Sequence, residues 1–357
     1  MLSCAPGSRE PEPGSIGPTA LKWTKPSYFP DPVYDISKNP LTQEGVELGR
    51  FLFYDGILSR TDKIGCGTCH QQQAAFTHHG HDLSHGVDDL LGTRNSPSIQ
   101  NLAWSSSFFW DGGVQDLDFV PQSPIQNKVE MDETVSHVME KLRLTPVTGA
   151  TKQVDYPKMF KAAFGTTEIN TERMMKALSQ FMLTMVSATS KYDYYKLGDA
   201  SALTTQEKDG MALFKKNCAT CHNGELFTDF SFRNNGIAPN KINDQGRYAI
   251  TLNESDRLKF KVPSLRNVGL TAPYMHDGRM TTLQEVLDHY ANDQINSPDS
   301  IYDSPTLDPA LKVVGQKKGI ALTSTEKLAI IAFLRTLNDE QFITDKRFSD
   351  PGIGTSF

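Results

Sequence analysis

Two short segments of the chain carry the same arrangement of thiol and imidazole side chains. Both have the form Cys-x-x-Cys-His, and the residues are Cys66, Cys69 and His70 in the first and Cys218, Cys221 and His222 in the second. Two thiols at this spacing can add to the two vinyl groups of a haem, while the adjacent imidazole binds the iron from below. We therefore expect two covalently bound haem c groups, with both histidines as proximal iron ligands.

A zinc site or a redox-active dithiol is the alternative interpretation of a single Cys-x-x-Cys-His segment. Here the segment occurs twice, and each copy follows a matching sequence. Residues 43–53 precede the first copy and residues 206–214 the second, and both are typical of a short amphipathic helix with a threonine cap, Thr42 or Thr205. Because the whole unit is repeated, haem attachment is the preferred interpretation.

The repeat continues beyond the cysteines. Asn101 ends a Pro-Ser-Ile-Gln-Asn segment nine residues before Trp110, and Asn267 ends a Pro-Ser-Leu-Arg-Asn segment nine residues before His276. Equal spacing of these motifs in both halves indicates two related units.

Each unit closes with a segment of helical periodicity, at about residues 171–187 and 324–337, and Thr323 with Glu326 forms a capping box in the second. No segment shows the sustained alternation of a strand. We therefore expect an all-α protein with two cytochrome c-like haem domains in tandem and long irregular loops. The expected division is a tether at residues 1–20, a first haem domain at 21–190, a second haem domain at 191–338 and a C-terminal tail at 339–357.

Composition limits the partners of the chain. Its 357 residues carry a net charge of −6 and form no basic stripe, which argues against nucleic acid. It contains no run of about 18 apolar residues that could span a bilayer. Residues 1–4 resemble the end of a lipoprotein signal, and residues 5–18 have the Pro- and Gly-rich composition of a tether. Cys4 is therefore a candidate lipid anchor, and the alternative is a stray cysteine in a disordered tail.

Five further segments resemble the signature sequences of bacterial di-haem cytochrome c peroxidases and their MauG-type relatives. They are residues 94–97, 109–112, 124–131, 261–267 and 271–279. The resemblance extends over about residues 41–339. It implies a peroxidase whose first haem reacts with hydrogen peroxide and whose second haem receives electrons from a small donor protein of the cytochrome c or cupredoxin type. A periplasmic location follows from haem attachment outside the cytoplasm, and a homodimer is the candidate oligomeric state.

The resemblance also assigns roles to individual residues. Glu130 matches the acid/base carboxylate over the peroxide site, where a proton must move from the inner to the outer oxygen. Trp110 matches the tryptophan between the two haems, whose indole can relay an electron. Asn95, Thr271 and Pro273 match positions that hold a calcium ion through a side-chain amide and backbone carbonyls, which suit that hard cation.

One departure from the peroxidase pattern lies near the peroxide site. Val120 stands ten residues after Trp110, where the family commonly has a glutamine. Either a polar partner is lost there, or Gln122 replaces it from a shifted loop.

A second departure concerns the second haem. Tyr290 stands fourteen residues after His276, where the peroxidases place a methionine on the iron and MauG-type enzymes a tyrosine. A phenolate favours oxidised iron more than a thioether does. On the expected helix, about residues 282–292, Tyr290 shares an apolar face, and the neighbouring His289 projects about 100° away, so only one of the two can meet the iron.

Four histidines cluster after the first cysteine pair, at positions 78, 79, 81 and 85. In many of the peroxidases a histidine on a mobile loop caps the first iron in the resting state. His85, which is followed by Gly86, is best placed for this role. The alternative is a solvated polar loop, since MauG-type enzymes leave that position open.

Three functions fit these observations. The first is a peroxidase that takes electrons from a small redox protein. The second is a MauG-like oxidase that uses peroxide to oxidise residues of a partner protein, and the third is a simple di-haem electron carrier. Glu130 and Trp110 argue against the electron carrier, which needs neither residue. Tyr290 favours the MauG-like oxidase over the peroxidase, but it does not decide between them.

Overall fold

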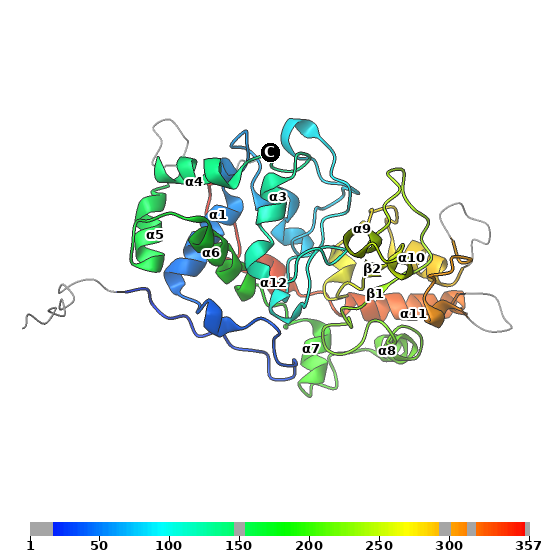
Figure 1. Ribbon diagram of the computed structural model, residues 1–357. Coiled ribbons are helices and arrows are strands. Elements are labelled where there is room, and N and C mark those ends of the chain that lie inside the picture. Colours follow the sequence, from blue (N-terminus) through cyan, green and yellow to red (C-terminus); the bar gives the residue numbers. More distant parts are fainter. Residues whose placement is uncertain (1–16, 146–153, 293–300, 313–318, 354–357) are drawn as a thin grey trace, which may run out of the picture.

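The computed structural model describes residues 17–145, 154–292, 301–312 and 319–353. The protein is mostly helical, with short helices joined by long irregular loops (Figure 1). The first half of the chain, residues 17–190, lies on the left of Figure 1 in blue to green, and the second half, residues 191–338, lies at the bottom and on the right. Cys4 and most of the expected tether lie outside the described residues.

The helices have the following bounds. In the first half they are α1 (Gln43–Tyr54), α2 (Cys66–Cys69), α3 (Gln122–Gln126), α4 (Val135–Arg143), α5 (Tyr156–Phe164) and α6 (Thr171–Thr184). In the second half they are α7 (Lys191–Lys196), α8 (Thr205–Asn217), α9 (Tyr248–Thr251), α10 (Leu283–Tyr290) and α11 (Ser324–Arg335), and α12 (Glu340–Thr344) follows. In the part of the chain that the structure describes, no helix is long and apolar enough to cross a bilayer.

Threonine side chains cap the N-termini of α1, α8 and α11. Thr42 caps α1, as expected, and Thr323 forms the expected capping box with Glu326 at α11. The cap of α8 is Thr204 rather than Thr205, because the carboxylate that completes the capping box lies three residues after Thr204.

The two halves pack their helices in the same way. In the first half α1 lies against α6, and a Cβ added to Gly49 would stand 1.9 Å from the carbonyl oxygen of Ala177. In the second half α8 lies against α11, and a Cβ on Gly210 would stand 1.9 Å from the carbonyl oxygen of Ala329. Only glycine permits this close approach of two helices. The sequence repeat therefore corresponds to a repeated helix crossing.

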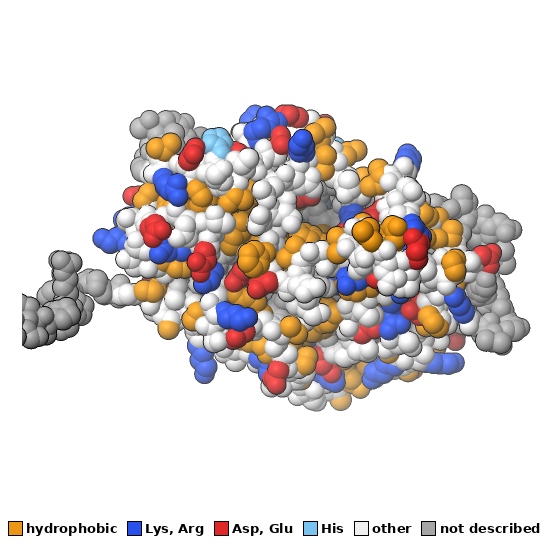
Figure 2. Space-filling view, in the orientation of Figure 1, with side chains coloured by type: hydrophobic (Ala, Val, Ile, Leu, Met, Phe, Trp, Pro, Cys, Tyr) orange, Lys and Arg blue, Asp and Glu red, His pale blue; other side chains and the backbone are white. Residues whose placement is uncertain are grey.

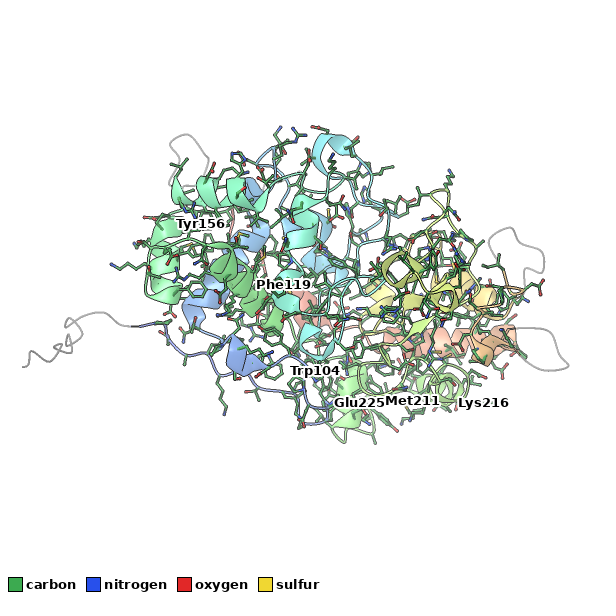
Figure 3. All side chains as sticks on the ribbon, viewed as in Figure 1. Trp104, Phe119, Tyr156, Met211, Lys216 and Glu225 are labelled. Atoms are coloured by element: carbon green, nitrogen blue, oxygen red, sulfur yellow. The ribbon has the colours of Figure 1, made fainter. Side chains whose placement is uncertain are left out.

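Each half has its own apolar core. The core of the first half includes Tyr156 and Trp104, and that of the second half includes Met211. Figure 3 labels these three side chains, with Tyr156 on the left, Trp104 near the middle and Met211 towards the lower right.

The all-α prediction needs a small correction. Strands β1 (Phe232–Arg233) and β2 (Phe260–Lys261) pair antiparallel, with Phe232 opposite Lys261. Two residues per strand are too few to produce a recognisable alternation of apolar and polar side chains.

The expected C-terminal tail returns to the first half. In Figure 1 α12, in red, lies among the helices of the first half. The ring of Phe342 on α12 lies 5.5 Å from that of Phe76, and the amide of Gln72 donates to the carbonyl of Asp345 at 2.8 Å. The tail therefore covers the segment that follows the first cysteine pair. The expected domain boundaries stay a prediction.

A buried ion pair lies inside the second half. The guanidinium of Arg266 donates to both carboxylate oxygens of Asp193 at 3.0 Å, and neither side chain is exposed to solvent. The same guanidinium lies 4.5 Å from the ring centre of Phe29, so it also holds the N-terminal segment of the first half. The pair thus joins α7 to the Pro-Ser-Leu-Arg-Asn segment and to the other half.

Replacing Arg266 with methionine should lower the free energy of unfolding by about 3–5 kcal/mol, because the buried Asp193 carboxylate would keep its hydrogen bonds from Ser190 but lose the cation that balances its charge. Urea denaturation of the intact protein measures this loss. Arg347, 79% exposed and paired with Asp345, is the matched control, and its replacement by methionine should cost about 1 kcal/mol or less. Equal losses for the two variants would contradict the expectation.

Candidate functional site

The four cysteines of the two repeated segments are free thiols. In each segment the chain forms one tight turn, since the His70 amide donates to the Cys66 carbonyl at 2.9 Å and the His222 amide to the Cys218 carbonyl at 3.0 Å. Each pair is thus held on one side of a single turn, with its histidine at the end. This geometry suits attachment of one planar group to both sulfurs.

The environment of the thiols disfavours zinc and redox-dithiol chemistry. Burial raises the pKa of Cys66 and Cys218 to about 12, and that of Cys69 and Cys221 to about 11. Redox-active cysteines need a lowered pKa. Moreover, no group of three or more His, Cys, Asp or Glu side chains is arranged to hold a metal ion among the described residues, which include all four thiols. The donor set therefore fits a haem better than these alternatives.

The two histidines have the same second contact. The Nδ1 of His70 lies 2.8 Å from the carbonyl of Phe76, and the Nδ1 of His222 lies 3.0 Å from the carbonyl of Phe227. A carbonyl can only accept, so Nδ1 carries the proton and Nε2 keeps its lone pair. Burial lowers the pKa of both imidazoles, which keeps them neutral, as a metal ligand must be. Both histidines are thus prepared to bind iron through Nε2.

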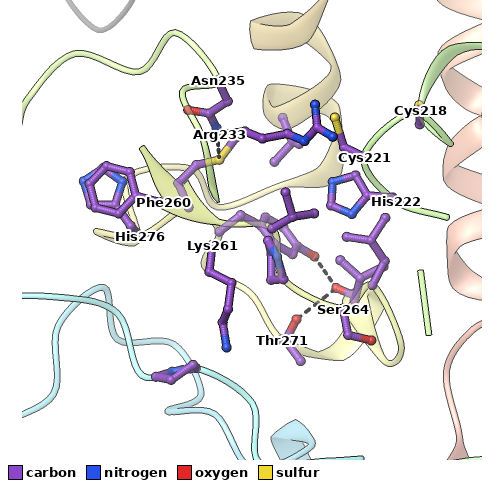
Figure 4. A pocket seen from close by; sticks show the side chains of 18 of the residues that line it. Cys218, Cys221, His222, Arg233, Asn235, Phe260, Lys261, Ser264, Thr271 and His276 are labelled. Carbon is purple, nitrogen blue, oxygen red and sulfur yellow. Dashed lines mark hydrogen bonds between the residues drawn. The ribbon is translucent and has the colours of Figure 1, made fainter. Parts of the chain in front are cut away.

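A cavity of about 300 Å³ lies beside the second cysteine pair. His222 and Cys221 face it in Figure 4. Its apolar wall comes from α8, α10 and α11 and includes Phe214, Leu283, Leu287, Ile330 and Leu334. Thiols, an imidazole and an apolar wall together form a suitable pocket for a haem.

Tyr290, at the end of α10, lines the same cavity. Burial raises the pKa of Tyr290 to about 12, and a hydrogen bond from Asn235 opposes that shift. The neighbouring His289 is buried, its Nε2 lies 2.9 Å from the carbonyl of Asn235, and it does not line the cavity. The alternative candidate Met280 does not line it either. Of these three candidate ligands for an iron bound by His222, only Tyr290 lines the cavity. Binding of Tyr290 to the iron stays a prediction.

Glu130 lies close to the first cysteine pair. Its negative charge adds to the effect of burial on the pKa of Cys66 and Cys69. Burial raises the pKa of Glu130 itself, and the amide of Asn127 donates to its Oε1 at 2.6 Å. A carboxyl group with a raised pKa and a fixed orientation is suited to act as an acid/base group.

Trp110 belongs to the first half, lies at the junction of the two halves and lines the cavity. Its indole Nε1 donates to the carbonyl of Asn95 at 2.9 Å, and its own carbonyl accepts from the Lys261 amide at 2.7 Å. The Asn95 amide in turn donates to the carbonyl of His276 at 2.8 Å. The indole is thus fixed between segments of both halves, and its position between two haems stays a prediction.

The three expected calcium ligands line the same cavity. They are Asn95 from the first half, and Thr271 and Pro273 from the second. The Nδ2 of Asn95 donates to the carbonyls of His81 and Asp82 at 3.3 and 3.0 Å, which leaves its oxygen available as a ligand. Calcium binding remains a prediction.

His85, in the loop after the first cysteine pair, contacts a carboxylate. The side chain of His85 is 43% exposed, and its Nδ1 lies 2.5 Å from the Asp89 carboxylate. Its backbone is close to the first site, since the Cys69 sulfur lies 4.0 Å from the His85 carbonyl. This contact occupies only Nδ1, so Nε2 keeps its lone pair for an iron. Capping of the first iron by His85 stays a prediction.

Gln122 does not supply the polar group that is missing at Val120. Its side chain is exposed on α3 and donates to Gln126 at 3.0 Å. Val120 packs against the core of the first half. The interpretation that a polar partner is lost is therefore the better of the two.

Two polar residues of the cavity were not singled out from the sequence. Asn235 contacts Tyr290, and Lys261 extends from β2 into the junction. Lys261 begins the signature segment 261–267, but no role was assigned to it there, and Asn235 lies in a loop without a motif.

Known proteins resemble the chain over most of its length. A family model described as di-haem cytochrome c peroxidase matches residues 43–201. The methylamine utilization protein MauG of Methylorubrum extorquens is 33% identical over 89% of this chain and 84% of that protein. The cytochrome c551 peroxidase of Nitrosomonas europaea is 32% identical over 85% and 82%. The chain belongs to the di-haem cytochrome c peroxidase and MauG family.

The fold agrees with this membership. The crystal structure of a MauG-like protein associated with microbial copper homeostasis superposes with a TM-score of 0.82, is 32% identical, and covers 93% of this chain and 99% of that chain. The resemblance drawn from the signature segments is thus confirmed. As a member of the di-haem peroxidase and MauG family, the chain is an oxidoreductase with two haem cofactors.

Proposed function

We propose that this family member reduces hydrogen peroxide at a haem c bound by Cys66, Cys69 and His70. The electrons pass through a second haem c, bound by Cys218, Cys221 and His222, from a small redox protein. The observation that carries the proposal is the partly buried carboxyl group of Glu130 beside the first cysteine pair. An electron carrier has no use for such a group.

The haem supplies the iron at which the O–O bond of peroxide is cleaved, and two electrons with two protons convert the peroxide to two molecules of water. Glu130 accepts the proton of the inner oxygen and delivers it to the outer oxygen, which then leaves as water. Asn127 keeps one carboxylate oxygen in place during this transfer. Trp110 provides the aromatic link across the junction through which electrons reach the first half.

Tyr290 favours a second candidate function, in which a partner protein supplies the electrons and is itself oxidised, as in MauG-like enzymes. A phenolate on the second iron stabilises its oxidised state, so that haem is a poor store of donor electrons. The Methylorubrum extorquens protein and the protein associated with copper homeostasis also carry MauG in their descriptions. Adding peroxide to the protein with either a reduced small cytochrome c or an oxidisable partner protein distinguishes the two functions.

The remaining assignments belong to the same proposal. A calcium ion would bind Asn95 Oδ1 and the carbonyls of Thr271 and Pro273. Haem c attachment implies a periplasmic location. We further propose that Cys4 is a lipid anchor and that the protein is a homodimer. Figure 2 shows acidic and basic side chains interspersed on one face of the molecule, so that face indicates no charge preference for a donor protein.

Mass spectrometry tests the cofactors directly. Protein produced together with a haem-attachment system should carry two haems that survive denaturation, because thioether bonds resist it. Replacing Cys218 and Cys221 with serine should leave one. A wild-type protein with one haem or none would overturn the proposal.

A further inference from the structure

The cavity beside the second cysteine pair contains one cation without a matching carboxylate. Three Lys or Arg side chains line it in the described part of the chain. Arg233 pairs with Asp229 at 2.6 Å, and Arg266 pairs with Asp193 at 3.0 Å. Lys261 has no Asp or Glu within ion-pair distance among the described residues, and its contacts are therefore of a different kind.

The ammonium group of Lys261 is held by neutral oxygens. It donates to the carbonyl of Ser107 at 2.6 Å and to the hydroxyl of Ser105 at 3.5 Å. In Figure 4 the side chain leaves β2 and points towards the light blue ribbon of the first half. An ammonium has three donors, so at least one remains for a further partner.

An enclosed cation without an anion is unfavourable. Burial lowers the pKa of Lys261 to about 8, and the charge of Asp111 only partly opposes this effect. Asp111 is itself engaged by Arg94 at 2.5 Å. A negatively charged partner in the cavity would remove the cost of burying the ammonium.

The group that the proposed function places in this cavity carries such a partner, because haem c has two propionate carboxylates. We propose that Lys261 is a positioning residue whose ammonium pairs with a propionate of the haem bound at Cys218, Cys221 and His222. This inference rests on the proposed function and deepens it. Since the Lys261 amide also donates to the carbonyl of Trp110 at 2.7 Å, one residue ties the haem edge to the relay segment.

The pairing has an electrostatic consequence. A positive charge next to the haem stabilises the reduced iron relative to the oxidised iron, because reduction adds one negative charge to the group. Removing the charge should therefore lower the reduction potential of the second haem. The first haem should be little affected, since its binding residues lie outside this cavity.

The test compares Lys261→Met, Lys261→Arg and Lys259→Met in the protein with both haems attached. Lys259 is the matched control, because it lies two residues away, pairs with Asp256 at 3.6 Å and does not line the cavity. Spectroelectrochemical titration gives the potential of each haem. We expect a lower second-haem potential in Lys261→Met, most of it restored in Lys261→Arg, and no change in Lys259→Met.

Three outcomes would overturn the inference. They are an unchanged second-haem potential in Lys261→Met, an equal shift in Lys259→Met, and a shift confined to the first haem. A loss of thermal stability without a change in potential would show that Lys261 only joins the two halves. Mass spectrometry of every variant distinguishes failure of this inference from failure of the proposed function. Absence of attached haem contradicts the proposed function. Normal attachment with unchanged potentials contradicts this inference alone.

Discussion

Replacing Glu130 with glutamine should slow the reaction with hydrogen peroxide by about 10²-fold or more, the usual effect of losing an acid/base group. Glutamine keeps the size of the side chain and its hydrogen bond with Asn127 but cannot accept a proton. Haem attachment should be unaffected. Stopped-flow spectroscopy of the oxidised protein mixed with peroxide measures the rate.

The pH dependence of the same reaction gives a second measurement. Only the carboxylate form of Glu130 accepts a proton, and burial raises its pKa above the usual range. The wild-type rate should therefore fall as the pH is lowered through that raised pKa, and the variant should lack this fall. Glu140→Gln, an equivalent change on the exposed face of α4, should behave like the wild type. A normal rate in the Glu130 variant would show that this residue takes no part in catalysis.

Local signals in the sequence predicted helices α1, α6, α8, α10 and α11. Thr323 with Glu326 determined the start of α11, and the glycines Gly49 and Gly210 lie where the repeated helices cross. The two-residue strands were missed because pairing between distant segments, rather than a local pattern, creates them. The place of α12 was missed for a similar reason, since Phe342 meets Phe76 only after the chain has returned to the first half.

The candidate site could be predicted where a motif has a fixed chemistry. The spacing of the cysteines and histidines was sufficient to predict haem attachment, which stays a prediction, and the family segments pointed to Glu130 and Trp110. Helical spacing could not separate Tyr290 from His289 as the residue on the cavity, because both belong to α10. The structure separates them through the contact of His289 with the Asn235 carbonyl. Lys261 could not be predicted at all, because its importance depends on the absence of a nearby carboxylate in three dimensions.

Replacing Tyr290 with methionine should raise the reduction potential of the second haem. Burial raises the pKa of the phenol to about 12, so the proton leaves only if a cation takes its place, and the iron of a haem held by His222 would be such a cation. The resulting phenolate favours oxidised iron, whereas a thioether favours reduced iron. Axial ligands shift haem potentials over about 0.8 V, so a rise of the order of 0.1 V or more is expected.

The phenylalanine variant completes the argument, because it removes the ligand without supplying another. Tyr290→Phe should give a second haem with an open or water-bound iron, visible in its electronic and EPR spectra. Tyr302→Phe is the matched control, since Tyr302 is a buried neighbour that donates to the His289 carbonyl at 2.8 Å and does not line the cavity. If both changes at Tyr290 leave the spectrum and potential as they are, Tyr290 is a packing residue and the second iron has another partner. A methionine variant could instead show a raised potential and faster electron uptake from a small cytochrome c. Its second haem would then store the donor electron that the phenolate excludes. That result would show that one ligand separates the MauG-like enzyme from the ordinary peroxidase.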